Sequence, residues 1–173
     1  MSLAEFLEWE ERQSARYEFV DGAVVMMAGG TLAHDDVRGA IYSALRRKLA
    51  GGKCRAYLDI KLVCPNGRSR YPDVAVVCGQ PDPTATRLTD PVVLVEVLSP
   101  STRATDYIMK SADYSSVPSV AVYLLVDPFE RHVDVLRRVD GVLMPAEDES
   151  EQTPVIELPE IGVSLTLAEI YGG

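Results

Sequence analysis

The sequence predicts one α/β domain of 173 residues, in which a mixed β-sheet carries helices on its faces. Strand-like and helix-like segments alternate along the chain, and the apolar segment 91–98 is typical of a strand covered on both faces. No repeat, low-complexity tract or linker divides residues 1–173. A domain of this length buries roughly 70% of the surface that its unfolded chain exposes, so it needs no disulfide or metal to fold.

The N-terminal part of the chain predicts a helix, a hairpin and a second helix. Apolar positions recur near helical spacing in residues 3–13. In "YEFVDGAVVMM", Asp21 and Gly22 stand between two runs of strand formers, which is typical of a type I′ hairpin because both central positions need a positive φ. Residues 33–50 carry apolar side chains at helical intervals, acids early and bases late, so they predict a helix with one apolar face.

Two strands follow this helix. Residues 54–64 and 71–78 are rich in strand formers, and the polar turn "PNGRS" lies between them. We therefore expect an antiparallel pair.

The remaining segments predict the centre and the far side of the sheet. Residues 91–98, 103–116 and 120–127 follow one another as strand, helix and strand, which at this length is a crossover between parallel neighbours. A hairpin over 131–144, an acidic loop and a short helix or turn over 165–171 complete the chain. Hairpins added at the N-terminal and C-terminal ends thus flank a sheet core with helices.

The net charge of −9 argues against a protein that grips nucleic acid with its whole surface, because phosphate binding depends on accumulated Lys and Arg. A local basic stripe is still compatible with this charge. Its members are Arg46, Arg47, Lys48, Lys53, Arg55, Arg68 and Arg70. A solvated helix end with adjoining turns explains the same residues equally well.

The cysteines and the apolar stretches bear on the compartment. Cys54, Cys64 and Cys78 are odd in number, too widely spaced for a C-x-x-C pair, and surrounded by apolar residues, so we expect reduced core residues. The apolar stretches are too short to span a bilayer, and "MSLAEFLEWEERQ" is acidic where a signal peptide is basic and then apolar. We expect a soluble cytoplasmic protein.

Two acids occupy positions that suit apolar residues. Glu96 lies inside the apolar strand "VVLVEVLSP", where an unpaired buried charge costs several kcal/mol, and Asp73 follows Pro72 at the start of the preceding strand. Carboxylates near the ends of adjacent strands can share a divalent cation, which can ionise a water and stabilise charge on a phosphoryl group. Alternatively, each acid accepts hydrogen bonds from backbone N–H groups or pairs with an arginine.

The helix predicted after Glu96 presents Asp106, Lys110 and Tyr114 at intervals of four, hence on one face. Because this helix directly follows the Glu96 strand, Lys110 can reach the site that the acids define and orient a water or neutralise charge there. An ordinary Asp106–Lys110 pair in solvent explains the same spacing.

The segments "YPDVAVV" and "VVLVEVLSPSTRATDYIMKSADYSSVPSVAVYLLVD" resemble the Uma2 family of endonucleases, a domain of unknown function within the PD-(D/E)XK nuclease superfamily. The N-terminal "RYEFVDGAVVMMAGG" with the histidine that follows resembles it too, so the similarity covers residues 16–128. This resemblance implies a restriction-endonuclease-like fold, Mg²⁺ as cofactor with Mn²⁺ as a substitute, and hydrolysis of phosphodiester bonds in DNA.

The resemblance also implies roles for single residues. Asp73 becomes the acid of the PD element and Glu96 the acid of the second element. The superfamily pattern has Lys two residues later, where this chain has Leu98. A helix lysine takes its place in the family, and this position corresponds to Lys110.

Two further residues are candidates for the metal site. His34 opens the first core helix, where the superfamily often places another acid near the metal, and it can equally be a cap or an exposed polar residue. Glu18, beside the Asp-Gly turn, can be the missing acid or an outward-facing strand residue.

Three hypotheses follow from these residues. The first is a metal-dependent nuclease in which Asp73 and Glu96 bind Mg²⁺, Lys110 assists the water, and Asp106 positions Lys110 or acts as a ligand through water. The second is a non-catalytic module that keeps the nuclease fold to bind DNA or protein. The third makes both acids purely structural. For a nuclease of this size we expect a homodimer, because C₂ dimers are the commonest assembly and two copies can cut both strands.

Overall fold

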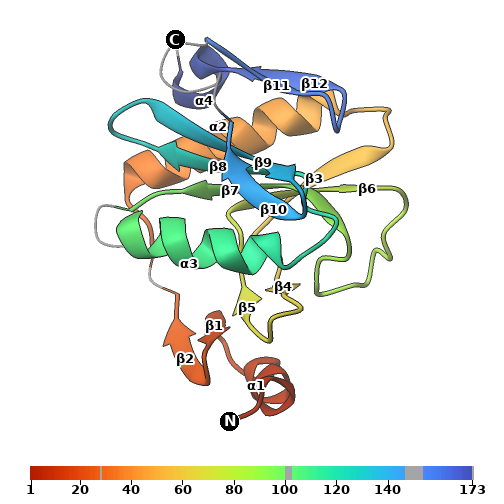
Figure 1. The fold of residues 1–173 in the computed structure, drawn as a ribbon, viewed down its shortest axis with the longest axis vertical. Helices are drawn as coiled ribbons and strands as arrows, with labels where there is room; N and C mark the ends of the chain where they lie inside the picture. The colour runs from red at the N-terminus through yellow and green to blue at the C-terminus, as the bar shows by residue number, and fades with distance from the viewer. Residues whose placement is uncertain (28, 100–102, 147–153, 173) are drawn as a thin grey trace.

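The computed structural model describes residues 1–27, 29–99, 103–146 and 154–172, with residues 103–106 described by their backbone alone. Its helices are α1 (Leu3–Glu10), α2 (Leu32–Lys48), α3 (Arg103–Ser115) and α4 (Leu167–Tyr171). The strands of this part of the chain form sheets of six, four and two strands (Figure 1). The predicted α/β class with a mixed sheet and flanking helices is confirmed.

The six-stranded sheet is the centre of the molecule, with strand order β10-β9-β8-β7-β6-β3. Its strands are β3 (Cys54–Leu58), β6 (Val74–Cys78), β7 (Pro91–Val97), β8 (Val122–Asp127), β9 (His132–Val139) and β10 (Val142–Pro145). The strands β7 and β8 run parallel, and every other neighbouring pair is antiparallel. The predicted crossover is therefore confirmed, with α3 as its helix.

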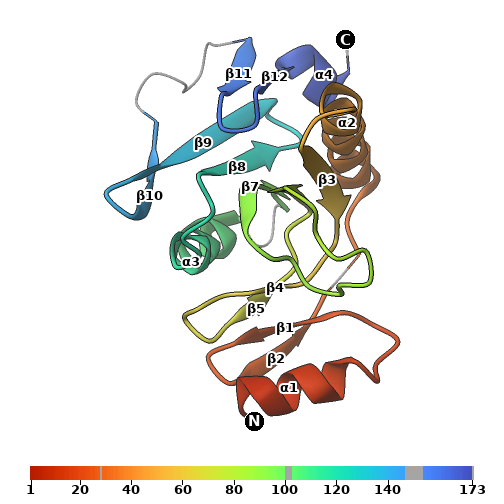
Figure 2. The same ribbon diagram turned by 90° about the vertical axis from the view of Figure 1, so that its right-hand side faces the viewer.

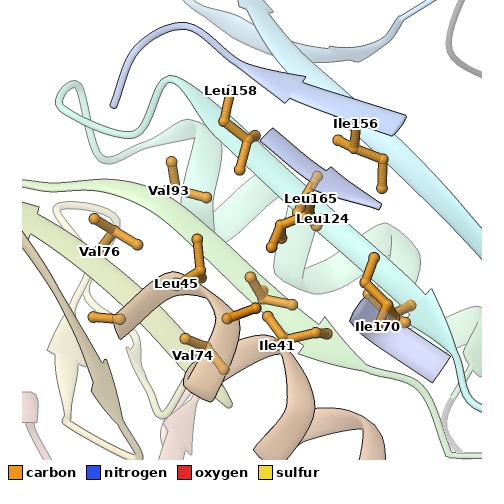
Figure 3. Close-up of a cluster of buried hydrophobic side chains, with 14 of the residues drawn as sticks. Ile41, Leu45, Val74, Val76, Val93, Leu124, Ile156, Leu158, Leu165 and Ile170 are labelled. Carbon is orange, nitrogen blue, oxygen red and sulfur yellow. The ribbon is translucent and has the colours of Figure 1, made fainter. Parts of the chain in front are cut away.

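Helix α2 covers one face of this sheet, together with α4 and the hairpin of β11 (Val155–Leu158) and β12 (Val163–Thr166) (Figure 1). On this face Val74, Val76 and Val93 pack with Ile41 and Leu45 of α2 (Figure 3). Such packing fixes where the N-terminal end of α2 meets the sheet. None of the helices in the described part is long and apolar enough to cross a membrane.

Helix α3 covers the opposite face, over a second apolar cluster that includes Ala75, Leu94 and Leu98. Successive side chains of a strand point to opposite faces. Glu96 therefore shares the α3 face with Leu94 and Leu98, whereas its neighbours in β7 belong to the α2 side.

A four-stranded sheet of order β2-β1-β5-β4 lies beyond α3, next to α1 (Figure 2). Its strands are β1 (Tyr17–Val20), β2 (Ala23–Met26), β4 (Leu62–Val63) and β5 (Ser69–Arg70). The predicted hairpin is confirmed, because Asp21 and Gly22 have φ angles of 50° and 84°, as a type I′ turn requires.

The single strand predicted over 54–64 is wrong. The segment turns at Asp59, which has a φ of 50°, and its two halves join different sheets. Residues 54–58 pair with β6 in the central sheet, and residues 62–63 pair with β5 in the small one. Asp can adopt the left-handed conformation itself, so this turn needs no Gly or Pro. The sequence therefore lacks the residues by which a turn is usually predicted.

The expectation of three reduced cysteines is also wrong, because Cys54 and Cys78 form a disulfide between β3 and β6 while Cys64 is free and buried. The two partners face each other in the antiparallel register. Gly79 N–H donates to Lys53 O at 2.8 Å, so Lys53 and Gly79 form a hydrogen-bonded pair of the ladder. The adjacent pair, Cys54 and Cys78, is therefore a non-hydrogen-bonded pair, in which side chains approach most closely. Sequence spacing alone did not reveal this register.

Candidate active site

Asp73 directly precedes β6, and Glu96 lies near the end of the neighbouring strand β7, at one edge of the central sheet. The register sets Val74 opposite Val95, which brings the start of β6 beside the end of β7. Asp73 Oδ2 accepts a hydrogen bond from Val97 N–H at 2.7 Å. Both acids are buried, with exposed fractions of 7% and 5%. The predicted pair of carboxylates at adjacent strand ends is thus present, and each acid needs a partner there.

Glu96 finds its partners on α3. Lys110 Nζ donates to Glu96 Oε2 at 3.0 Å, and Tyr114 OH donates to Glu96 Oε1 at 2.6 Å. Burial raises the pKa of Glu96 to about 8 and outweighs the Lys110 ammonium, which acts in the opposite direction, while Asp73 adds to the rise. Burial therefore disfavours the ionised form of Glu96, and Lys110 offsets only part of this effect.

Lys110 points into the protein rather than into solvent. Its exposed fraction is only 9%. The side chain of Asp106 lies outside the described residues. Leu98, at the position where the superfamily pattern has Lys, is buried in the apolar cluster under α3. The ammonium group beside Glu96 thus comes from the helix, as the resemblance implied.

His34 comes from the first turn of α2 and meets Asp73. The turn begins at Thr31, whose hydroxyl accepts a hydrogen bond from His34 N–H. His34 Nε2 lies 3.2 Å from Asp73 Oδ1, and this hydrogen bond raises the pKa of His34 against the effect of burial. His34 therefore faces the site and is neither an exposed polar residue nor the helix cap.

Glu18 also faces the site, so its interpretation as an outward-facing strand residue is wrong. Its Oε2 accepts from Arg70 Nη1 at 2.7 Å, and its Oε1 accepts from Tyr71 N–H at 3.3 Å. The same Oε1 lies 4.0 Å from Lys110 Nζ. Lys110 thus sits between Glu96 and Glu18, with Arg70 holding the second acid in place.

Sequence reasoning missed a buried ionic cluster behind this lysine. Asp113, fully buried on α3, accepts from Arg70 Nε and Arg68 Nη1 at 2.7 Å each, and from Asn66 Nδ2 at 2.8 Å. These donors belong to the β4–β5 hairpin of the small sheet. The cluster therefore ties the small sheet to α3. The sequence offered only an acid in "KSADYSS" and, more than 40 residues earlier, a turn with two arginines, so nothing local connected them.

Arg138 of β9 fixes the C-terminal end of α3. Its guanidinium donates to the carbonyls of Ser115 at 3.1 Å and Val117 at 2.7 Å, and to Val120 O at 2.6 Å. These carbonyls include those that a helix end leaves without an intrahelical partner. Helix α3 is thus anchored to the central sheet at one end and to the small sheet through Asp113.

Several members of the proposed basic stripe lie away from this site, whereas Arg70 borders it through Glu18. Arg55 lies in the half of β3 that pairs with the C-terminal part of β6, whereas Asp73 precedes β6 at its other end. Arg47 and Lys48 bind Glu169 of α4. The two arginines of the β4–β5 hairpin are engaged with acids, as described above.

The two carboxylates of Asp73 and Glu96 suit Mg²⁺ better than a metal ion whose ligands all come from the protein. Among the side chains that the structure describes, those of residues 1–27, 29–99, 107–146 and 154–172, no three from His, Cys, Asp or Glu gather closely enough to hold a metal ion. Mg²⁺ is usually bound by one or two carboxylates, with waters and substrate phosphates as its other ligands. Asp73 and Glu96 fit that pattern, whereas a structural Zn²⁺ site needs four protein ligands.

Comparison with known proteins gives matches along the whole chain. The model of the Uma2 family, described as "Putative restriction endonuclease", matches residues 3–168. An uncharacterized protein of Synechocystis sp. is 33% identical over 177 residues, covering 100% of this chain and 92% of its own length. A second uncharacterized Synechocystis protein is 28% identical over 144 residues, covering 80% of this chain and 81% of its own length.

A solved structure with the same fold is among the matches. It is the crystal structure of "a putative nuclease belonging to DUF820" from Anabaena variabilis, with a TM-score of 0.75 and 20% sequence identity. The match covers 99% of this chain and 97% of the other. At this identity the likeness concerns the fold.

Proposed function

This chain belongs to the Uma2 family, whose description is "Putative restriction endonuclease", and from this premise we propose that it is a metal-dependent endonuclease that hydrolyses phosphodiester bonds in DNA. The observation that carries the proposal is the meeting of Asp73, Glu96 and Lys110 at one edge of the central sheet. Two acids can hold a divalent cation and a lysine can stabilise developing charge, and metal-assisted phosphodiester hydrolysis uses both effects.

In this proposal Asp73 and Glu96 would hold Mg²⁺, or Mn²⁺ in its place. A bound ion of this kind acidifies a water and neutralises charge on the phosphoryl group. Lys110 would turn its ammonium from Glu96 toward the attacking water or a phosphate oxygen and so stabilise charge in the transition state. Asp106 supports Lys110 or acts through a water.

His34 and Glu18 support these groups in the proposal. His34 donates to Asp73 and so restrains the carboxylate, as hydrogen bonds to a metal ligand commonly do. Glu18 places a second acid 4.0 Å from Lys110 Nζ, so the ammonium keeps a partner when it moves away from Glu96. Neither residue is needed as a ligand for a cation that takes most of its coordination from water and phosphate.

The substrate is proposed to be duplex DNA, cut without strict sequence preference, and the whole chain acts as one domain. Two copies related by a C₂ axis would supply one cut on each strand.

The test is cleavage of supercoiled plasmid DNA with and without Mg²⁺ or Mn²⁺. We expect metal-dependent nicking that Asp73→Asn abolishes, and Lys110→Met lowers kcat by about 10²–10³-fold, the usual cost of a lost transition-state donor. A matched control is Asp134→Asn, because Asp134 Oδ1 lies 3.1 Å from His132 Nε2 and so resembles the Asp73–His34 pair outside the site. Calorimetry that detects no divalent metal binding to the purified protein contradicts the proposal at its first step.

The competing hypothesis of a non-catalytic nuclease-fold module has less support. It would be favoured by a Lys110 ammonium directed away from the acids or bound in a distant pair. The ammonium instead lies 3.0 Å from Glu96 Oε2. The hypothesis predicts DNA or protein binding without metal-dependent nicking, and the plasmid assay separates the two.

A further inference from the structure

The hydroxyl of Tyr114 contacts Glu96 but takes no part in the proposed reaction. We infer that Tyr114 is a positioning residue of the metal site, whose hydroxyl holds the Glu96 carboxylate in the orientation that receives the cation. This inference rests on the proposed function, because it concerns the same pair of acids. The juxtaposition that carries it is the hydrogen bond from Tyr114 OH to Glu96 Oε1, at 2.6 Å.

The two oxygens of Glu96 have different donors, both on α3. Tyr114 OH serves Oε1 and Lys110 Nζ serves Oε2. The two donors are four residues apart and hence lie one above the other on the same helix face. With one donor on each oxygen, the carboxylate cannot rotate about its last bond without breaking a charge-assisted hydrogen bond.

The two donors differ in their freedom to move. Lys110 has a long flexible stem and a second acid, Glu18, 4.0 Å from its ammonium. In the proposed reaction it leaves Glu96 to act on the water or the phosphate. Tyr114 would then be the side-chain donor that still restrains Glu96 while the reaction proceeds.

Tyr114 is itself rigidly held. Its side chain is fully buried, and its ring packs edge-on against Tyr123 with the centroids 5.0 Å apart. Leu98 and Val117 belong to the same apolar cluster. Arg138, which anchors the end of α3, also reaches the carbonyl of Tyr114 at 3.4 Å. A ring so confined places its hydroxyl with little loss of entropy, which is what a positioning group requires.

The surroundings also indicate why this residue is Tyr and not Phe. The cluster around the ring is apolar, so packing alone would accept a phenylalanine. A buried hydroxyl without a partner is unfavourable, and the partner present is a carboxylate of the proposed site. The hydroxyl is therefore directed to Glu96 and not to the core.

The test is the affinity for Mn²⁺, measured by calorimetry at fixed pH in the absence of DNA, for the wild-type protein, Tyr114→Phe and Tyr123→Phe. We expect Tyr114→Phe to weaken Mn²⁺ binding by about 10- to 100-fold, the usual effect of losing a hydrogen bond to a residue that binds the metal. Tyr123→Phe removes a hydroxyl from the same aromatic pair without touching Glu96, and its affinity should equal that of the wild type. Equal affinities of wild type and Tyr114→Phe overturn the inference.

A double-mutant comparison tests whether Tyr114 acts on the metal site through Glu96 or through the stability of the fold. In a Glu96→Ala background, which removes the acceptor of the Tyr114 hydrogen bond, adding Tyr114→Phe should change the weakened Mn²⁺ affinity no further. A further loss there means that Tyr114 acts through the fold, and it overturns the inference. A wild-type protein that binds no Mn²⁺ overturns the proposed function, whereas tight wild-type binding with an unaffected Tyr114→Phe overturns only the role of Tyr114.

Discussion

Replacing Asp113 by Asn should destabilise the protein strongly, because this acid is the centre of the buried cluster between α3 and the small sheet. Its carboxylate is fully buried and accepts three hydrogen bonds, two of them from arginines. Breaking a buried ion pair from one side costs about 3–5 kcal/mol. When Asp113 is replaced, Arg70 still has Glu18 as a partner, so its charge is not left wholly unpaired. We therefore expect a loss at the lower end of this range, about 3 kcal/mol.

The measurement is urea and thermal unfolding of the metal-free protein. For a chain of this size, about 3 kcal/mol lowers Tm by about 6–12 °C. The control is again Asp134→Asn, whose carboxylate is about one-third exposed and pairs with His132, so its loss should cost less than about 1 kcal/mol. If Asp113→Asn destabilises no more than the control, the cluster does not tie α3 to the small sheet as argued.

Two further predictions concern pH and the disulfide. Because the pKa of Glu96 is about 8 in the folded protein against 4.5 for an ordinary glutamate, the folded state binds its proton more tightly. The stabilisation from this proton is complete below about pH 4.5 and is lost as the pH rises through about 8. Urea unfolding across this window should show a decline that Glu96→Gln reduces, and identical declines would contradict the burial argument. Reducing the Cys54–Cys78 disulfide, which joins residues 24 apart, should cost about 3 kcal/mol and lower Tm. Dithiothreitol should leave the Tm of the variant with both Cys54→Ser and Cys78→Ser unchanged. Equal Tm values of the oxidised and reduced wild-type protein would refute the prediction.

Local patterns in the sequence were sufficient for most of the fold. Asp21-Gly22 predicts its hairpin because only residues that tolerate a positive φ fit that turn. The parallel pair of β7 and β8 follows from an apolar strand, a helix of suitable length and another apolar strand, because a chain can join parallel neighbours only by such a crossover. The split of residues 54–64 was not predictable in this way, since it depends on two different partner strands.

For the candidate site, the sequence by itself determined which groups are available. An acid inside an apolar strand must find a partner, and the lysine on the next helix is close along the chain, so the meeting of Glu96 and Lys110 could be predicted. Asp73 could be placed beside them because consecutive strands commonly pair.

Only the tertiary structure decided how these groups are held. Glu18, Arg70 and Asp113 meet across separations of 43 and 52 residues, and the disulfide joins strands whose register no local pattern specifies. Such contacts depend on how the small sheet docks on α3, which is a sum of packing and hydrogen-bond energies over many residues. Side-chain type and spacing report local geometry, whereas the docking of separate elements is settled only when the whole core is packed.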